Sequence, residues 1–110
     1  MNGFWEIENV TAQGETFVPK GKATLVDYYY LDTTNKGFRK KLSPSFNQSY
    51  ESSEDVTPFV ILQKKEGFFL KYTTRYDTWE EKLSTITPDQ LVLTHQGKTY
   101  YYKRHEKLSL

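Results

Sequence analysis

Cysteine is absent from this chain of 110 residues. Without cysteine, the protein can form neither a disulfide framework nor a zinc or redox site built on thiolates. Net charge is almost absent too, because 15 lysine and arginine residues oppose 14 aspartate and glutamate residues, for a formal charge of +1. This balance excludes the strong basic field of typical nucleic-acid-binding proteins, so we expect no nucleic-acid partner.

Long apolar runs are also missing. No window approaches the roughly 20 apolar residues that a membrane-spanning helix needs, so we expect no transmembrane segment. The first residues, MNGFWEIE, have neither the charged region nor the apolar region of a secretory signal. Two locations stay open: the periplasm or cell envelope if a signal has been removed, and the cytoplasm otherwise.

Aromatic residues, in contrast, are plentiful. They make up 16% of the chain and include nine tyrosines, whereas hydrophobic residues in total reach only 36%. The core must therefore be built from few but large side chains. The length predicts one domain, spanning residues 1–110, with enough chain to bury a core without disulfides.

Alternation of apolar and polar residues with a period of two recurs along the whole chain, which predicts strands and no helix. Ile86 breaks the alternation set by Trp79 and Leu83, which predicts a bulge or a strand end near Ser84. Between the third and fourth strands, the serine-rich segment 43–55 is expected to be a loop. The eight expected strands are 4–11, 23–31, 38–42, 58–65, 68–76, 78–86, 91–95 and 99–104.

Short strands in this order, joined by tight turns, favour an all-β fold: a single antiparallel up-and-down meander. Closing the meander into a barrel of roughly eight strands removes the exposed sheet edges that promote aggregation. A barrel of this size has room for packed side chains or for one small ligand.

Two segments resemble lipocalins, members of the calycin group, and in particular the lipocalin-like domains of small envelope proteins of Gram-negative gut bacteria. Gly3-Phe4-Trp5 is similar to the G-x-W opening of the first lipocalin strand, and ITPDQLVLTHQGKTYYYKR, residues 86–104, is similar to the family's closing strands. The resemblance implies that Arg104 packs across Trp5 and closes one barrel end by a cation–π contact. Lys103 should point to the opposite face.

Departures from the family pattern are also visible. The middle of the chain carries no second lipocalin motif, and the final residues, EKLSL, leave no room for the helix that follows the barrel in lipocalins proper. These two departures from the family pattern bear on how large a cavity the barrel can enclose.

Chemistry-bearing motifs are scarce. The two histidines, His95 and His105, have no recognisable Ser or Asp partner, and no catalytic, phosphate-binding or dinucleotide motif is present. The acidic run 51–55 lacks the spaced oxygen ligands of a calcium loop. We therefore expect no enzymatic activity, no metal site and no cofactor.

The resemblance implies a protein that binds a small hydrophobic or amphipathic molecule inside the barrel. Aromatic rings would then supply contact area, and tyrosine hydroxyls or Arg75 would orient the ligand. The predicted lining consists of Tyr28, Tyr30, Tyr72, Tyr76, Trp79, Tyr100 and Tyr102.

Two alternatives stay open at this point. The same rings can simply fill the barrel, or exposed tyrosines and the serine-rich loop can dock a partner protein of the cell envelope. If a ligand is bound, the segment Phe46 to Asp55 is expected to act as a lid or to flank one barrel mouth.

Overall fold

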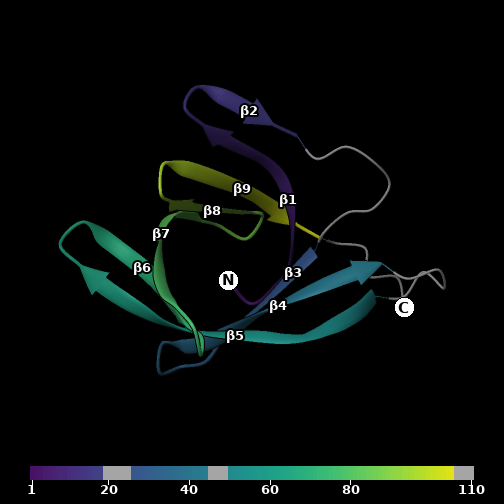
Figure 1. Ribbon diagram of the computed structural model, residues 1–110, viewed down its shortest axis with the longest axis vertical. Helices are drawn as coiled ribbons and strands as arrows, with labels where there is room; N and C mark the ends of the chain where they lie inside the picture. Colours follow the sequence, from purple (N-terminus) through teal and green to yellow (C-terminus); the bar gives the residue numbers. More distant parts are fainter. Residues whose placement is uncertain (19–25, 45–49, 106–110) are drawn as a thin grey trace.

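A computed structural model of the chain describes residues 1–18, 26–44 and 50–105, with residues 42–44 and 50–55 described by their backbone only. In these ranges the chain forms strands and no helix, and every strand pair is antiparallel (Figure 1). No helix in the described part has the length and apolar character needed to cross a membrane. The strands are β1 (Gly3–Ala12), β2 (Glu15–Phe17), β3 (Val26–Leu31), β4 (Lys36–Pro44), β5 (Tyr50–Lys64), β6 (Gly67–Thr73), β7 (Thr78–Ile86), β8 (Gln90–His95) and β9 (Lys98–Arg104).

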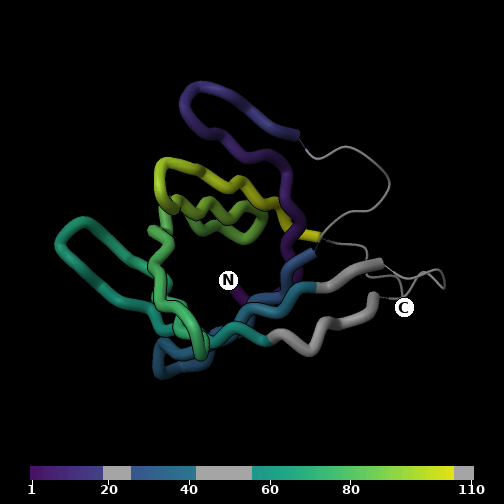
Figure 2. Tube along the Cα trace, viewed as in Figure 1, coloured from purple at the N-terminus to yellow at the C-terminus, as the bar shows by residue number. Residues whose placement is uncertain are grey.

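Closure of the sheet depends on β1, which pairs with both β3 and β9. Strands β1 and β3 to β9 therefore form a closed antiparallel barrel of eight strands, as the sequence predicts. The start of β1 lies beside β3, and a register shift between Ile7 and Asn9 bends the strand along β9. Beyond the bend, β1 also pairs with β2. This β1–β2 hairpin extends beyond the barrel wall (Figure 2).

The predicted strand list differs from the structure at β2, at the end of β6 and in the serine-rich segment. Strand β2 is not predicted, because it has only three residues and all of its side chains are exposed, so it shows no alternation. Its turn is made by Gln13 and Gly14, both with positive φ, which is the backbone of a tight two-residue hairpin. In addition, β6 ends at Thr73 rather than at Tyr76, because the backbone amide of Thr74 donates to the Asp77 carbonyl and turns the chain.

The serine-rich segment is also more regular than predicted. Ser43 and Pro44 belong to β4, and the backbone from Tyr50 to Asp55 belongs to β5, with Leu42 opposite Ser52 and Pro44 opposite Tyr50. The prediction of one loop over 43–55 is therefore wrong at both of its ends, because backbone pairing extends the hairpin beyond its apolar residues. Residues 45–49 lie outside the described part of the chain, as do residues 23–25 of the predicted second strand.

The predicted irregularity near Ser84 is confirmed. The β7–β8 register shifts between Leu83 and Thr85, so Leu83 pairs with Leu93 and Ile86 pairs with Leu91. Because both partner leucines are fully buried, the bulge lets Leu83 and Ile86 share one face although their spacing is odd.

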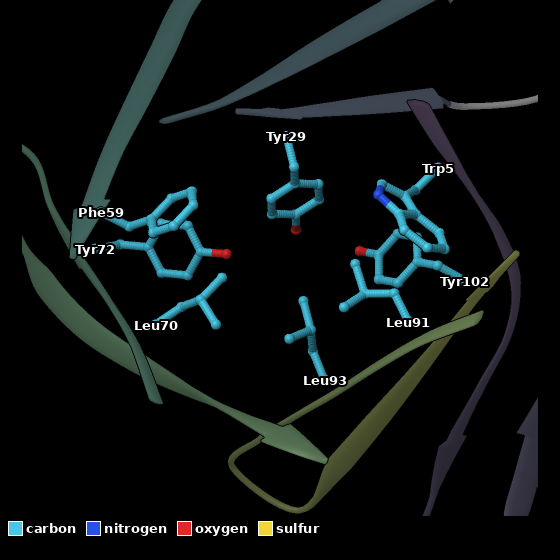
Figure 3. Packing of buried hydrophobic residues seen from close by; sticks show 8 residues of the cluster. All are labelled: Trp5, Tyr29, Phe59, Leu70, Tyr72, Leu91, Leu93 and Tyr102. Carbon is cyan, nitrogen blue, oxygen red and sulfur yellow. The ribbon is translucent and has the colours of Figure 1, made fainter. Parts of the chain in front are cut away.

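The core lies inside the barrel and is rich in aromatic rings (Figure 3). Large buried side chains of this kind each contribute roughly 1.5–3 kcal/mol to stability. They come from six of the eight barrel strands, so core packing connects strands from all sides of the barrel. Its buried members are Trp5, Tyr29, Phe59, Leu70, Tyr72, Leu91, Leu93 and Tyr102.

One end of the barrel is closed by Arg104. Its guanidinium carbon lies 4.1 Å from the centroid of the Trp5 ring, the arrangement that the lipocalin resemblance implies. Arg104 also donates from Nε to the Pro88 carbonyl (2.9 Å) and from Nη1 to the Asn2 carbonyl (2.7 Å). Lys103 points away and pairs with Glu6 (3.3 Å).

The surroundings of Gly3 explain why the G-x-W pattern begins with glycine. Its φ is +127°, and a Cβ at this position would lie 2.2 Å from Nη1 of Arg104. Any other residue would therefore displace the guanidinium from Trp5. Gly3 leaves room for the guanidinium of Arg104, and Trp5 provides the ring on which that guanidinium packs.

Candidate functional site

A cluster of ionisable side chains lies inside the barrel, among the aromatic rings. Arg39 on β4 is opposite the buried Tyr29, and Glu81 on β7 is opposite the buried Leu70, so the strand register points both inward. The side chains of Arg39 and Glu81 keep only 15% and 10% of their exposure. Asp27, two residues before Tyr29 on β3, faces the same side. We call Asp27, Arg39 and Glu81 the interior charge cluster.

Arg39 and Glu81 form a loose ion pair. Nη1 of Arg39 is 4.0 Å from Oε1 of Glu81, which is beyond hydrogen-bond distance. The guanidinium instead lies over the Tyr72 ring, with Cζ 4.9 Å from the ring centroid. Glu81 is thus held near a cation without a hydrogen bond from it.

Aromatic rings form a continuous wall beside the interior charge cluster. Tyr29 and Phe59 have ring centroids 6.1 Å apart, and Phe59 and Tyr72 are 5.5 Å apart. Tyr72 then stacks on Trp79 at 5.2 Å with an interplanar angle of 15°. The four rings come from β3, β5, β6 and β7, so the wall spans half of the barrel strands.

Three buried polar atoms in this region make no hydrogen bond of ordinary length and angle to the described residues: the hydroxyls of Tyr29 and Tyr72, and Oε1 of Glu81. The Tyr72 hydroxyl has only weaker polar interactions with Tyr29 and Glu81. Figure 3 shows the hydroxyls of Tyr29, Tyr72 and Tyr102 directed from different sides of the barrel into its interior. A buried polar atom without a partner costs about 1–3 kcal/mol. The barrel therefore carries polar groups that its own described side chains satisfy only incompletely.

Burial dominates the electrostatics of the cluster. Desolvation raises the pKa of the Asp27 carboxyl, and attraction to Arg39 and Lys41 offsets this only in part. Burial raises the pKa of the Tyr29 and Tyr72 hydroxyls well above the usual value, so both stay neutral. Desolvation alone lowers the pKa of Arg39, but the surrounding tyrosines and carboxylates raise it overall, so its charge is retained.

Asp27→Asn is expected to raise the free energy of unfolding at neutral pH. The folded-state pKa of Asp27 lies above its unfolded value of 3.8, so ionisation disfavours the folded state. This cost is fully present above the folded pKa and disappears as the pH falls below the unfolded value. Urea unfolding of both proteins at neutral pH and below pH 3.8 checks the prediction: the difference must shrink on acidification. A difference of opposite sign at neutral pH would contradict it.

Four of the predicted lining residues do come together inside the barrel. Tyr72 is fully buried and Tyr102 is nearly so, whereas Trp79 and Tyr100 are partly buried and pack against the core. Their role in binding stays a prediction.

The inward orientation predicted for Tyr28 and Tyr30 is wrong. Tyr29 between them is fully buried, so alternation turns its two neighbours to the outer face, where Tyr30 is 41% exposed. There, Tyr28 contacts Phe4 and Phe38 at centroid distances of 4.9 and 6.1 Å, and Tyr30 contacts Phe38 at 5.5 Å. These four residues form a row of rings on the outside of β1, β3 and β4.

Arg75 and Tyr76 also lie away from the interior. Both are exposed, and Tyr76 keeps 88% of its exposure, because the turn after Thr73 takes them out of β6. The segment predicted as a lid, Phe46 to Asp55, cannot be compared in full: residues 46–49 lie outside the described part, and from Tyr50 onward the backbone belongs to β5.

The interior charge cluster itself was not predicted. A signal for Glu81 exists in the sequence, because the alternation that puts Trp79 and Leu83 inside puts Glu81 inside as well. Arg39 gives no such signal: in FRKKL it looks like one of three solvent-facing cations, and only its pairing with Tyr29 places it inside. On β3, Asp27 lies on the face opposite to Tyr28 and Tyr30. A charged residue usually faces solvent, so the sequence predicts that the face that Asp27 shares with Tyr29 is the outer one.

The contacts of the two histidines with Glu80 and Glu6 lie outside this cluster. His95 Nδ1 lies 2.8 Å from the Glu80 carbonyl oxygen, and His105 Nδ1 lies 3.3 Å from Oε2 of Glu6. In the described ranges, no group of three or more His, Asp or Glu side chains is placed to hold a metal ion.

Comparison with solved structures identifies the architecture. A lipocalin-like protein from Bacteroides uniformis superposes with a TM-score of 0.55 over 94% of this chain and 97% of its own, at 10% sequence identity. The chain has a lipocalin-like fold. A second match in shape is an uncharacterized protein from Bacteroides eggerthii, with a TM-score of 0.57, 11% identity and coverage of 94% and 98%. No protein-family model and no curated protein matches the sequence.

Proposed function

We propose that this lipocalin-like chain is a binding protein without catalytic activity that holds a small amphipathic molecule inside its barrel. The observation that carries the proposal is the set of unpartnered polar atoms, the Tyr29 and Tyr72 hydroxyls and Glu81 Oε1, buried among aromatic side chains. Ligand sites typically combine an apolar, aromatic lining with a few convergent polar groups. Both components are present here.

A barrel filled only for stability would not need these groups. Phenylalanine in place of Tyr29 or Tyr72 and an apolar residue in place of Glu81 would keep the packing and avoid the cost of unpaired polar atoms. A bound molecule with a polar group offsets that cost, because it supplies the missing hydrogen bonds. The presence of polar side chains at these positions is therefore better explained by binding than by packing.

A protein-interaction role is the second candidate, and the outer ring row of Phe4, Tyr28, Tyr30 and Phe38 favours it. Phe38 is opposite Pro58 in the β4–β5 register, next to an open groove of about 180 Å³. Tyrosine and phenylalanine are enriched in protein interfaces. An envelope partner, as the resemblance implies, would dock on this face and need no space inside the barrel. The groove is lined by Lys36, Gly37, Pro58, Phe59, Val60, Lys71 and Thr73.

Tyr72→Phe is expected to weaken binding of the internal ligand by about five- to tenfold, the effect of one lost hydrogen bond. The ring and the packing are kept, so the fold should be at least as stable as before. Tyr76→Phe is the matched control: it removes the same hydroxyl from a side chain that is 88% exposed, and binding should not change.

The measurement is native mass spectrometry of the gently purified protein before and after exposure to a metabolite and lipid extract, with tryptophan emission as a second readout. A retained molecule that is displaced from Tyr72→Phe but not from Tyr76→Phe supports an internal site. If no mass is added under any condition, the barrel is filled by its own side chains and the proposed function fails.

A further inference from the structure

The charges inside the barrel do not balance. Among the described residues, the two carboxylates Asp27 and Glu81 accompany one largely buried cation, Arg39, while Lys41, opposite Asp27 on β4, is exposed to solvent. When Asp27, Arg39 and Glu81 are all ionised, the interior charge cluster has one excess negative charge, which the solvent-exposed Lys41 offsets only in part. Such an excess in a low-dielectric interior favours a positively charged guest over a neutral or negative one.

The unpartnered atoms have the chemistry that a cation needs. Oε1 of Glu81 is a pure acceptor when ionised, and the hydroxyl oxygens of Tyr29 and Tyr72 can accept as well as donate. Glu81 is 7% exposed, and both tyrosines are fully buried. An ammonium group has three donors and no acceptor, so its donor count matches these three acceptor atoms.

The aromatic wall adds to the same preference. Ring faces attract cations, and the arrangement of Arg39 over Tyr72 already shows one such contact in this barrel. A carboxylate ligand could bind Arg39, but it would lie beside Glu81 and Asp27, and the like charges would repel each other. The apolar core residues suit an aromatic or aliphatic body attached to the charged group.

We propose that the molecule bound inside the barrel is an organic amine, whose ammonium group pairs with Glu81 and the Tyr29 and Tyr72 hydroxyls while its apolar body packs against the rings. This inference rests on the proposed function, because it names the ligand class of that same site. Arg39 keeps its place over Tyr72 and is not displaced.

Three probes that share a 2-phenylethyl group and differ in their polar group test the inference: 2-phenylethylamine, 2-phenylethanol and 3-phenylpropionate. Each is titrated into the full chain at neutral pH. Binding is followed by calorimetry and by the emission of Trp5 and Trp79, which both belong to or pack against the core. We expect the amine to bind at least about tenfold more tightly than the alcohol, and the carboxylate to bind most weakly.

Glu81→Gln is expected to remove most of the preference for the amine while leaving the affinity for the alcohol within about twofold. Glu80→Gln is the matched control, because Glu80 is the neighbouring residue on β7, is half-buried and pairs with Lys64 on the outer face. It should change neither affinity. The comparison of the three probes on the unaltered chain needs no variant and stands even if Glu81→Gln fails to fold.

The outcomes separate the inference from the proposed function. Equal binding of amine and alcohol, or tightest binding of the carboxylate, overturns the amine inference and leaves an internal binding site in place. Binding of the amine that Glu81→Gln leaves unchanged also overturns it. If none of the probes binds and no molecule is retained from the extract, the proposed function fails, and the inference fails with it.

Discussion

Arg39→Met should lower the free energy of unfolding by about 3–5 kcal/mol, the usual cost of removing one partner from a buried ion pair. The loss is expected to exceed that of Glu81→Met. Without Arg39, both Asp27 and Glu81 remain in the barrel with no buried cation, whereas without Glu81 the guanidinium still has Asp27 nearby. Urea unfolding of the two single variants, followed by tryptophan emission, gives the order directly.

The double variant Arg39→Met/Glu81→Met should recover most of that loss, or exceed the original stability. When both ions are replaced by apolar side chains of similar volume, no unpaired charge remains to be desolvated. The Lys64–Glu80 pair, which joins β5 to β7 on the outer face, is the control: Lys64→Met/Glu80→Met should change stability by at most about 1 kcal/mol. If the stability losses of Arg39→Met and Glu81→Met simply add in the double variant, the two side chains are not energetically coupled.

Recovery of stability in the double variant would come with loss of ligand binding. The interior charge cluster would then be an example of a site that is kept at the expense of stability because function needs it. Calorimetric titration of the double variant with 2-phenylethylamine measures this loss on the same samples.

Trp5→Ala should lower the free energy of unfolding by about 3–5 kcal/mol, as is usual for a buried tryptophan. Trp5 is fully buried, its Nε1 donates to the Met1 carbonyl at 2.8 Å, and its ring lies beneath Arg104. Removing the ring leaves a cavity and deprives the guanidinium of its contact. Trp79 remains as the emission probe for urea unfolding.

Tyr76→Ala is the control for this change, since it removes an aromatic ring that is 88% exposed, and it should change stability by less than about 0.5 kcal/mol. A loss below about 1 kcal/mol for Trp5→Ala would mean that the barrel end can close without the tryptophan. In that case the Trp5 and Arg104 contact would not be a determinant of the fold.

Local signals made the closed barrel and the bulge near Ser84 predictable, because both follow from the alternation of apolar and polar residues and from its break at Ile86. The Trp5–Arg104 pair, in contrast, was implied only by the resemblance to lipocalins. Strand β2 could not be predicted in this way, because its three exposed residues carry no hydrophobic pattern. Its existence depends on the turn at Gln13 and Gly14 and on backbone pairing with β1.

For the tyrosines predicted to bind a ligand on β3, the alternation of apolar and polar residues does not determine which face of the strand points into the barrel. Three consecutive tyrosines offer equal apolar surface to both faces of β3, so the sequence alone does not decide whether Tyr29 or its neighbours point inward. The decision comes from long-range register: Asp27 pairs with the inward-facing Trp5, and Tyr29 pairs with Arg39. Register between strands depends on tertiary packing, which a single sequence does not display.

Closure of the barrel by its first and last strands also governs how the chain reaches this structure. Arg104 donates to the carbonyl of Asn2, a residue 102 positions away, and β1 can pair with β9 only after that strand has been made. Contacts at such sequence separation make folding slow relative to helical proteins of similar length. During synthesis, Arg104 therefore cannot cover Trp5 until β9 emerges, so the nascent chain carries an exposed aromatic segment while β3 to β8 are made.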